Sequence, residues 1–179
     1  MREELLNLGS DKRYTFIGIF ERTGFKREYV NNSKSMWVDD YDGIYKPTLL
    51  LTNVRLKESG ELVTDHLWFN YTKQFVKLGE LKQGDILQFN GRVALYKKGM
   101  AGSFEKDYKI ERPTKITLLK KVNVKRDPIP DIDKSRALIG YIIEQNKQFY
   151  DENGRSYNHF YLDELKNGVS YMDFYRKSR

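Results

Sequence analysis

Cysteine is absent from the sequence, and several kinds of chemistry are excluded with it. A chain without thiols forms no disulfide, has no cysteine nucleophile and cannot build a zinc site on thiolates. Long apolar runs are also absent, since none reaches the roughly 18 residues that a membrane-spanning helix needs. Residues 1–11 carry Glu3, Glu4 and Asp11 where a secretory signal has basic and then apolar residues. We therefore expect a cytoplasmic protein with no membrane partner.

Histidine is scarce, which weakens most enzyme hypotheses. The chain has only His66 and His159, they fall in different predicted units, and no HxxxH or HxE spacing occurs. Asp39, Asp40 and Asp42 are clustered as magnesium ligands of a nuclease can be, but acids close to a glycine are typical of loops. We predict no active site, no metal site and no cofactor, and keep a nuclease that uses these aspartates as the last of three hypotheses.

Aromatic residues and positive charge are abundant instead. The 13 Tyr and 10 Phe, with a hydrophobic share of 39%, argue against a disordered chain. The net charge is +7, and the surplus is concentrated between Arg92 and Arg126, where 11 bases face 3 acids. Binding to a phosphate backbone requires such a concentration of Lys and Arg. The composition therefore favours a polyanionic partner.

Alternating apolar residues predict a mainly β fold with five strands. The strands are expected at residues 13–22, 47–57, 62–71, 86–96 and within 107–121. Gly18 permits a bend in the first strand, Gly91 interrupts the fourth, and Pro113 indicates an edge or a bulge in the fifth. Residues 23–46 are predicted to form a long irregular loop, and residues 99–103 a flexible one. The core is expected to include Phe16, Phe20, Phe69 and Phe89.

The second and third strands are predicted to form a hairpin around a turn at residues 58–61. Strand side chains alternate between the two faces, so Leu67 and Phe69 on the inner face place His66 and Trp68 on the outer face. An exposed tryptophan needs a partner, for which the sequence leaves two alternatives. Either a nucleobase stacks on Trp68, or the carboxy-terminal helix covers it.

A short helix is predicted at residues 72–81, between the third and fourth strands, with Thr72 as a potential cap. The run from Leu81 to Val93, LKQGDILQFNGRV, is similar to the beginning of the fourth strand in OB-fold nucleic-acid-binding proteins. In that family a Gly-Asp turn leads into alternating apolar residues with a glycine in mid-strand. The resemblance covers residues 12–121 and implies a five-stranded OB-type β-barrel with a helix between strands three and four. In length and composition the chain also resembles single-stranded-DNA-binding accessory proteins of Gram-positive phages and conjugative elements.

The segment Arg126 to Pro130 predicts a stiff linker, because two prolines oppose both a helix and a central strand. We therefore divide the chain into a barrel domain at residues 1–126 and a carboxy-terminal helix with an aromatic extension at residues 127–179. A helix is expected at residues 134–147. Helical spacing predicts that one of its faces is formed by Ala137, Leu138, Tyr141, Ile142 and Gln145. The aromatic residues that follow are expected to pack, and residues 131–179 to support self-association or a protein partner.

The resemblance also implies where a ligand lies. OB barrels bind single strands across strands two and three, between the loops that join strands one and two and strands four and five. The residues placed there are Trp68, His66, Arg55 and Lys57 on the central strands, Lys34 and Trp37 in the first loop, and Arg92, Tyr96, Lys97, Lys98, Lys106 and Lys109 around the second. Aromatic rings stack on bases while Lys and Arg contact phosphates.

The leading hypothesis is binding of single-stranded nucleic acid, DNA favoured over RNA, in replication, transfer or repair, without catalysis. The alternative from another class is a mobile-element protein that inhibits a host nucleoprotein enzyme through protein-protein contacts. Bacterial single-strand-binding proteins usually end in an acidic tail, whereas this chain ends Tyr175-Arg176-Lys177-Ser178-Arg179. Recruitment of partners through an acidic tip is therefore not expected.

Overall fold

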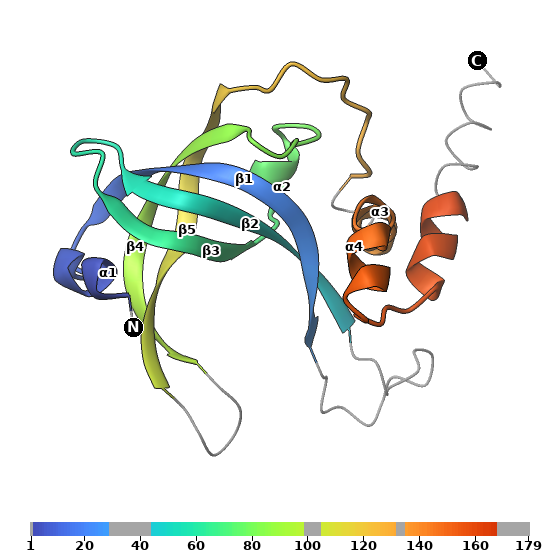
Figure 1. Ribbon diagram of the computed structural model, residues 1–179, viewed down its shortest axis with the longest axis horizontal. Helices are drawn as coiled ribbons and strands as arrows, with labels where there is room; N and C mark the ends of the chain where they lie inside the picture. Colours follow the sequence, from blue (N-terminus) through green and yellow to red (C-terminus); the bar gives the residue numbers. More distant parts are fainter. Residues whose placement is uncertain (1, 29–43, 99–104, 132–134, 168–179) are drawn as a thin grey trace. The chain divides into compact units, whose positions relative to one another are not determined.

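A computed structural model describes residues 2–28, 44–98, 105–131 and 135–167 of the chain. Within these ranges, five strands are accompanied by short helices (Figure 1). The elements are α1 (Glu3–Leu8), β1 (Arg13–Glu28), β2 (Ile44–Leu56), β3 (Leu62–Asn70), α2 (Lys73–Val76), β4 (Ile86–Lys98), β5 (Glu105–Lys120), α3 (Ser135–Gln145) and α4 (Lys147–Glu152). Residues 160–167 are also helical.

The strands form one five-stranded antiparallel sheet in the order β3-β2-β1-β4-β5. This confirms the mainly β prediction and the short helix between the third and fourth strands. Strands β3 and β5 are the two edges of this sheet, so closure into a barrel is not confirmed. The predicted loop at residues 23–46 was wrong at both ends, because β1 continues to Glu28 and β2 begins at Ile44. Polar residues in these strand ends hide the alternation on which the prediction depended.

The chain forms two compact units, each built from several segments. Unit 1 comprises Met1–Arg22, Leu50–Phe69 and Glu80–Arg126, and unit 2 comprises Thr23–Leu49, Asn70–Gly79 and Asp127–Arg179. Unit 1 carries 18 Lys and Arg against 12 Asp and Glu, a net charge of +6. Unit 2 carries 14 against 13, a net charge of +1. Almost the whole positive surplus of the chain therefore belongs to unit 1.

The core of unit 1 is built from the aromatic residues expected there. The rings of Phe16 and Phe89 stack with centroids 5.6 Å apart, and Phe69 meets Phe89 edge-on at 5.2 Å. Burying each such side chain contributes about 1.5–3 kcal/mol. Gly91 has a packing reason, since a Cβ on it would lie 2.1 Å from Cγ2 of Ile110 on β5. The glycine in mid-strand therefore lets the side chain of Ile110 cross β4.

Helix α1 was missed by the sequence analysis. It contains only six residues, and Arg2 at its N-cap position makes no side-chain capping bond, so the usual signals for a helix start are lacking. Leu5 is nevertheless fully buried, and α1 lies against β4 and β5 (Figure 1). Tertiary packing of one leucine therefore stabilises a helix that is too short to form alone.

Strand β5 contains two bulges where it pairs with the middle of β4. The register steps from Gln88↔Thr117 to Asn90↔Thr114 and then to Arg92↔Glu111, so each two-residue step on β4 faces three residues on β5. The extra residues include Arg112 and Lys115, with positive φ values of 49° and 50°. The bulge that Pro113 predicted is thus confirmed. Bulges of this kind bend a strand and redirect its side chains.

The turn before β4 contains a fully buried carboxylate that is paired with a partly exposed arginine. Asp85 is completely inaccessible, and both its carboxylate oxygens accept hydrogen bonds from the Arg126 guanidinium, at 2.7 and 2.8 Å. The carboxylate also accepts bonds from the backbone N–H groups of Lys82 and Val122, both at 2.9 Å. Burial raises the pKa of Asp85, but these bonds outweigh it and hold the pKa below the ordinary aspartate value. Asp85 therefore joins the turn at Lys82 to the segment after β5.

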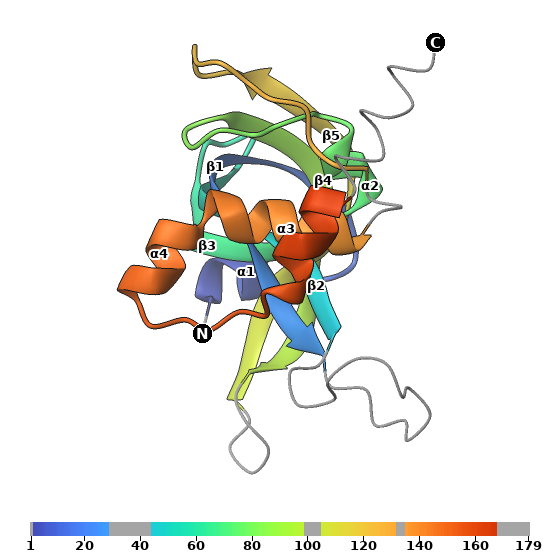
Figure 2. The same cartoon turned by 90° about the vertical axis from the view of Figure 1, so that its right-hand side faces the viewer.

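Unit 2 has a separate aromatic core. Figure 2 shows α3 beside the helix at residues 160–167, and a Cβ on Gly140 would lie 2.0 Å from the carbonyl oxygen of Tyr161. Only glycine permits this close approach. The buried cluster consists of Phe25, Tyr45, Ile139, Ile143, Tyr150 and Tyr161. The predicted face of the helix was partly wrong, because Ile139 and Ile143 are buried whereas Gln145 is exposed.

Several expected features have other outcomes. Thr72 occupies the N-cap position of α2, but its side chain makes no capping hydrogen bond, so that part of the prediction was wrong. The expected packing of the carboxy-terminal aromatics is confirmed for Tyr161, which is buried, and for Tyr157, which packs against the cluster. In the part of the chain that the structure describes, every helix is too short or too polar to cross a membrane.

Candidate nucleic-acid interface

Trp68 lies on the solvent-facing side of β3, as the alternation predicted. Its neighbours Leu67 and Phe69 are buried, while Trp68 keeps 42% of its surface exposed. The guanidinium carbon of Arg22, at the end of the unit 1 part of β1, lies 5.0 Å from the Trp68 ring centroid. A cation over one face of an indole is held by the ring quadrupole. The structure therefore brings an exposed flat ring on β3 next to a positive charge on β1, across the intervening strand β2.

His66 lies two residues before Trp68 and is fixed by its neighbour. Its Nδ1 is 2.9 Å from Oδ2 of Asp65, and its backbone N–H donates to Oδ1 of the same carboxylate at 2.8 Å. The hydrogen bond from His66 lowers the pKa of Asp65. Asp65 is thus an exposed acid bonded to His66, and its charge offsets part of the positive charge of the cations nearby.

Arg55 and Lys57, on β2 and directly after it, are both exposed, as the predicted interface requires. The Arg55 guanidinium donates to the carbonyl oxygen of Gly60 in the β2–β3 turn at 3.0 Å. The backbone N–H of Lys57 donates to the carbonyl of Thr15 on β1 at 2.9 Å. Both residues are thus anchored to the sheet by hydrogen bonds, next to the strand that carries Trp68.

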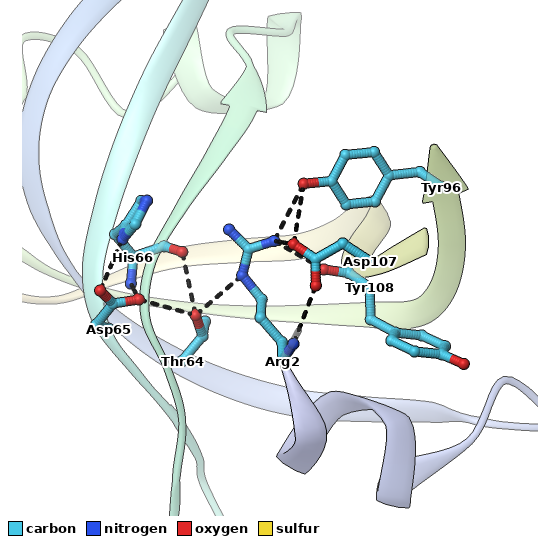
Figure 3. Close-up of polar contacts among 7 residues, drawn as sticks. All are labelled: Arg2, Thr64, Asp65, His66, Tyr96, Asp107 and Tyr108. Atoms are coloured by element: carbon cyan, nitrogen blue, oxygen red, sulfur yellow. Dashed lines mark hydrogen bonds and ion pairs between the residues drawn. The ribbon is translucent and has the colours of Figure 1, made fainter. Parts of the chain in front are cut away.

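Arg2 bridges the two edges of the sheet (Figure 3). Its Nε donates to Oγ1 of Thr64 on β3 at 3.2 Å, and its Nη1 forms an ion pair with Asp107 on β5 at 2.8 Å. The same Nη1 donates to the hydroxyl of Tyr96 at 3.2 Å and to the carbonyl of Tyr108 at 3.0 Å. The pKa of Asp107 is lowered overall, because the bonds and charges from this network outweigh burial, which raises it.

This network changes the interpretation of Tyr96. Its hydroxyl bonds to Arg2 and to Asp107, so it is occupied within the protein. The ammonium of Lys109 lies 5.8 Å from the centroid of the Tyr96 ring. The ring of Tyr96 and the charge of Lys109 are therefore neighbours on the β4–β5 hairpin, although they are 13 positions apart in the chain.

The basic residues predicted on the hairpin divide into two groups. Arg92 donates to Oε1 of Glu111 on the paired strand at 2.9 Å, whereas Lys106 and Lys109 are exposed. Lys97 and Lys98 lie at the end of β4, where Lys97 pairs with Lys106, but their side chains are outside the described residues. Trp37 and Lys34, together with the aspartates at positions 39, 40 and 42, also lie outside the described residues.

Sequence reasoning missed several cations of unit 1 whose neighbours are determined by the fold. Arg22 reaches Trp68, and Arg13 lies directly opposite Arg92 in the pairing of β1 with β4. Arg112 and Lys115 are the positive-φ residues of the two bulges in β5. Arg13 and Arg22 are the first and last residues of the first predicted strand, so the sequence could have indicated them as candidate phosphate contacts. By contrast, the bulge positions depend on the pairing between β4 and β5.

Unit 2 contains an open hollow of about 440 Å³, lined by Tyr150, Asp151, Gly154, Arg155, Ser156, Tyr157 and His159. Several of its polar groups are already bonded within unit 2. Asp151 forms an ion pair with Lys147 and accepts a hydrogen bond from the hydroxyl of Tyr157 at 3.1 Å. Within the described ranges, no group of three or more His, Asp or Glu side chains is arranged to hold a metal ion.

The sequence matches no protein-family model and no curated protein. Function is therefore inferred from the geometry and charge of the residues themselves.

Proposed function

We propose that unit 1 binds single-stranded nucleic acid, DNA in preference to RNA, and serves replication, transfer or repair as an accessory protein. The observation that carries the proposal is the pairing of exposed Trp68 with Arg22 on the surface of the sheet. A base stacked on an aromatic side chain contributes about 1–3 kcal/mol for any base, and arginine adds a cation–π contribution. Trp68 is thus the proposed stacking platform.

The charge of unit 1 supports the same function. Its net charge is +6, and Arg55, Lys57, Lys106 and Lys109 are exposed on strands or directly beside them. Cations on such a surface attract phosphates and release the counterions that surround a nucleic acid. We therefore propose that Trp68 stacks on the bases and that the surrounding Lys and Arg side chains contact the phosphates.

The arrangement of strands is compatible with an OB-type fold. OB folds are five-stranded, partly open Greek-key barrels that bind oligonucleotides across strands two and three. The sheet order β3-β2-β1-β4-β5, with α2 between β3 and β4, leaves one opening, between β3 and β5. Arg2 contacts both of these edges through side-chain bonds. We propose that the sheet acts as an OB barrel closed at this gap by Arg2.

Fluorescence anisotropy with labelled single-stranded oligonucleotides tests the proposal directly. We expect saturable binding that weakens steeply with salt, with a slope of about 0.7 for each phosphate contacted. Trp68→Ala is expected to weaken binding by about 5- to 150-fold, the equivalent of one lost stacking contact. Trp68→Phe keeps a ring and serves as the matched control, so it should retain most of the affinity.

The same titrations distinguish the alternatives. Absence of binding at low salt, together with a stable complex with a nucleoprotein enzyme, would support the inhibitor hypothesis instead. Magnesium-dependent cleavage that is lost in Asp40→Asn would support the nuclease hypothesis. Equal affinity for Trp68→Ala and the wild-type protein would overturn the role of the exposed ring.

A further inference from the structure

Two arginines lie opposite each other on neighbouring strands of unit 1, although their like charges repel. Arg13 on β1 is the direct cross-strand partner of Arg92 on β4, and Arg92 is in turn the partner of Glu111 on β5. Like charges directly opposite each other destabilise a sheet. One carboxylate in this row of three residues therefore offsets two guanidinium groups.

The surroundings of Glu111 add further cations. Its Oε1 is 2.9 Å from Nη2 of Arg92 and 4.0 Å from Nε of Arg112. The hydrogen bond from Arg92 lowers the pKa of Glu111, and the charges of Arg92, Arg112 and Lys109 lower it further. Three cations thus surround a single acid, and Arg13 lies opposite one of them, Arg92, on the neighbouring strand. We name Arg13, Arg92, Lys109 and Arg112 the basic cluster.

The backbone holds the basic cluster in place. The guanidinium of Arg13 donates to the carbonyl of Asn90 at 3.0 Å, to the carbonyl of Arg112 at 2.6 Å and to Oγ1 of Thr114 at 2.9 Å. These acceptors are neutral, so none of them offsets the positive charge of the guanidinium. Arg112 is held at a φ of 49°, a conformation that non-glycine residues rarely adopt. Such strained residues are concentrated at functional sites, where the surrounding structure fixes them.

We propose that the basic cluster binds backbone phosphates of the nucleic acid and that Glu111 competes with them for Arg92. This inference deepens the proposed function and rests on it. An incoming phosphate accepts hydrogen bonds from Arg92 and neutralises the cluster, while Glu111 is released toward solvent. Arginine suits this role because its planar guanidinium donates two parallel hydrogen bonds to a phosphate. Glu111 therefore has two effects. Its negative charge reduces repulsion among the cations of the basic cluster, and it lowers the affinity of the cluster for phosphate.

The edge position of β5 offers another explanation for its charged residues. Because β5 is an edge strand, its charged side chains also oppose pairing with the edge of another sheet. If that were their only role, the charge of Glu111 would have no particular effect on nucleic-acid binding. Removing the acid therefore separates the two interpretations, since only a phosphate site gains affinity when its internal competitor is lost.

The experiment compares Glu111→Gln with Glu58→Gln in the full chain, using labelled single-stranded oligonucleotides at several salt concentrations. Both variants remove one negative charge from unit 1, but Glu58 lies in the exposed β2–β3 turn, outside the basic cluster. We expect Glu111→Gln to bind about 5-fold tighter than Glu58→Gln at low salt, with the difference shrinking as salt screens the charges. Lys109→Gln, which leaves the Arg92–Glu111 bond intact, should bind about 2- to 5-fold more weakly than wild type.

Thermal unfolding provides a second readout that does not depend on affinity alone. Without Glu111 the arginines repel each other, so the melting temperature of Glu111→Gln should fall at low salt and recover when the oligonucleotide is added. Wild-type binding with equal affinities for Glu111→Gln and Glu58→Gln would overturn the phosphate site and leave the proposed function intact. A wild-type protein that binds no oligonucleotide would overturn both.

Discussion

The two units contain similar numbers of cations but place them in different surroundings. In unit 2, the guanidinium of Arg155 lies 5.0 Å from the ring centroid of Phe25 and donates to the Phe25 carbonyl at 2.8 Å. Arg27 lies 5.4 Å from the ring of Tyr45 and donates to the carbonyl of Ser156. In unit 1, Arg92 and Arg112 instead lie around the carboxylate of Glu111, and Arg13 is the cross-strand partner of Arg92. Arg27 and Arg155 of unit 2 thus pack on aromatic rings of its core, whereas Arg13, Arg92 and Arg112 of unit 1 form a charged surface.

The largest effect is expected at Asp85, a fully buried acid of unit 1. Asp85→Asn removes the buried carboxylate that pairs with partly exposed Arg126 and accepts two backbone N–H bonds, and the loss of these charge-assisted hydrogen bonds costs about 3 kcal/mol. We expect the free energy of unfolding, measured by urea denaturation, to fall by this amount. Asp11→Asn changes the same charge at an exposed position and should have almost no effect. A similar small effect for both would show that the pair contributes little.

The same residue predicts a pH dependence. The pKa of Asp85 is lower in the folded state, so its contribution to stability is fully present above the unfolded value of about 3.9. That contribution is lost as the pH falls through the folded pKa, because the unfolded chain then binds the additional proton. We expect the stability difference between wild type and Asp85→Asn to be constant near pH 7 and to shrink below pH ~4. A difference that persists unchanged into acid would contradict this explanation.

Arg155→Ala tests the unit 2 side of the comparison. It removes a hydrogen bond from a charged donor and cation–π contacts to Phe25 and Tyr150, so a loss of about 2 kcal/mol in stability is expected. Oligonucleotide affinity, measured by anisotropy at a temperature where the variant remains folded, should stay unchanged. A clear loss of affinity would place nucleic-acid binding in unit 2 as well.

Lys57→Gln tests the unit 1 side and should produce the smallest effect. The side chain is exposed and follows β2, so its loss is expected to leave the melting temperature unchanged. If it contacts one phosphate, affinity falls by about 2- to 5-fold for all sequences, and the salt slope decreases by about 0.7. Lys166→Gln removes the same charge from unit 2 and should change neither quantity.

Local patterns were sufficient for the regular part of unit 1. Alternation placed Leu67 and Phe69 inside and Trp68 outside. Because proline is unfavourable in a central strand, Pro113 indicated an edge or a bulge in the fifth strand. The extension of β1 to Glu28 was not predictable in this way, because residues 23–28 contain Gly24 and three charged residues. Their strand conformation depends on pairing with other segments.

The remaining site residues depend on contacts between distant parts of the chain. Arg2 and Asp107 are 105 positions apart, and nothing near either residue identifies the other as its partner. The pairing of Arg13 with Arg92 follows from the register of β1 and β4, which alternation alone does not determine. Arg22 stacks on Trp68 through the same kind of long-range contact. Sequence patterns thus gave the strands and the exposed tryptophan, but not the cations that the fold brings to them.

Tryptophan fluorescence tests the central claim most directly. The chain contains two tryptophans, so Trp37→Phe leaves Trp68 as the only indole that reports. Stacking of a base on Trp68 should quench its emission saturably as an unlabelled single-stranded oligonucleotide is added, with the same midpoint as the anisotropy titration. Unchanged Trp68 emission while the oligonucleotide binds would contradict the account, since the nucleic acid would then contact another surface.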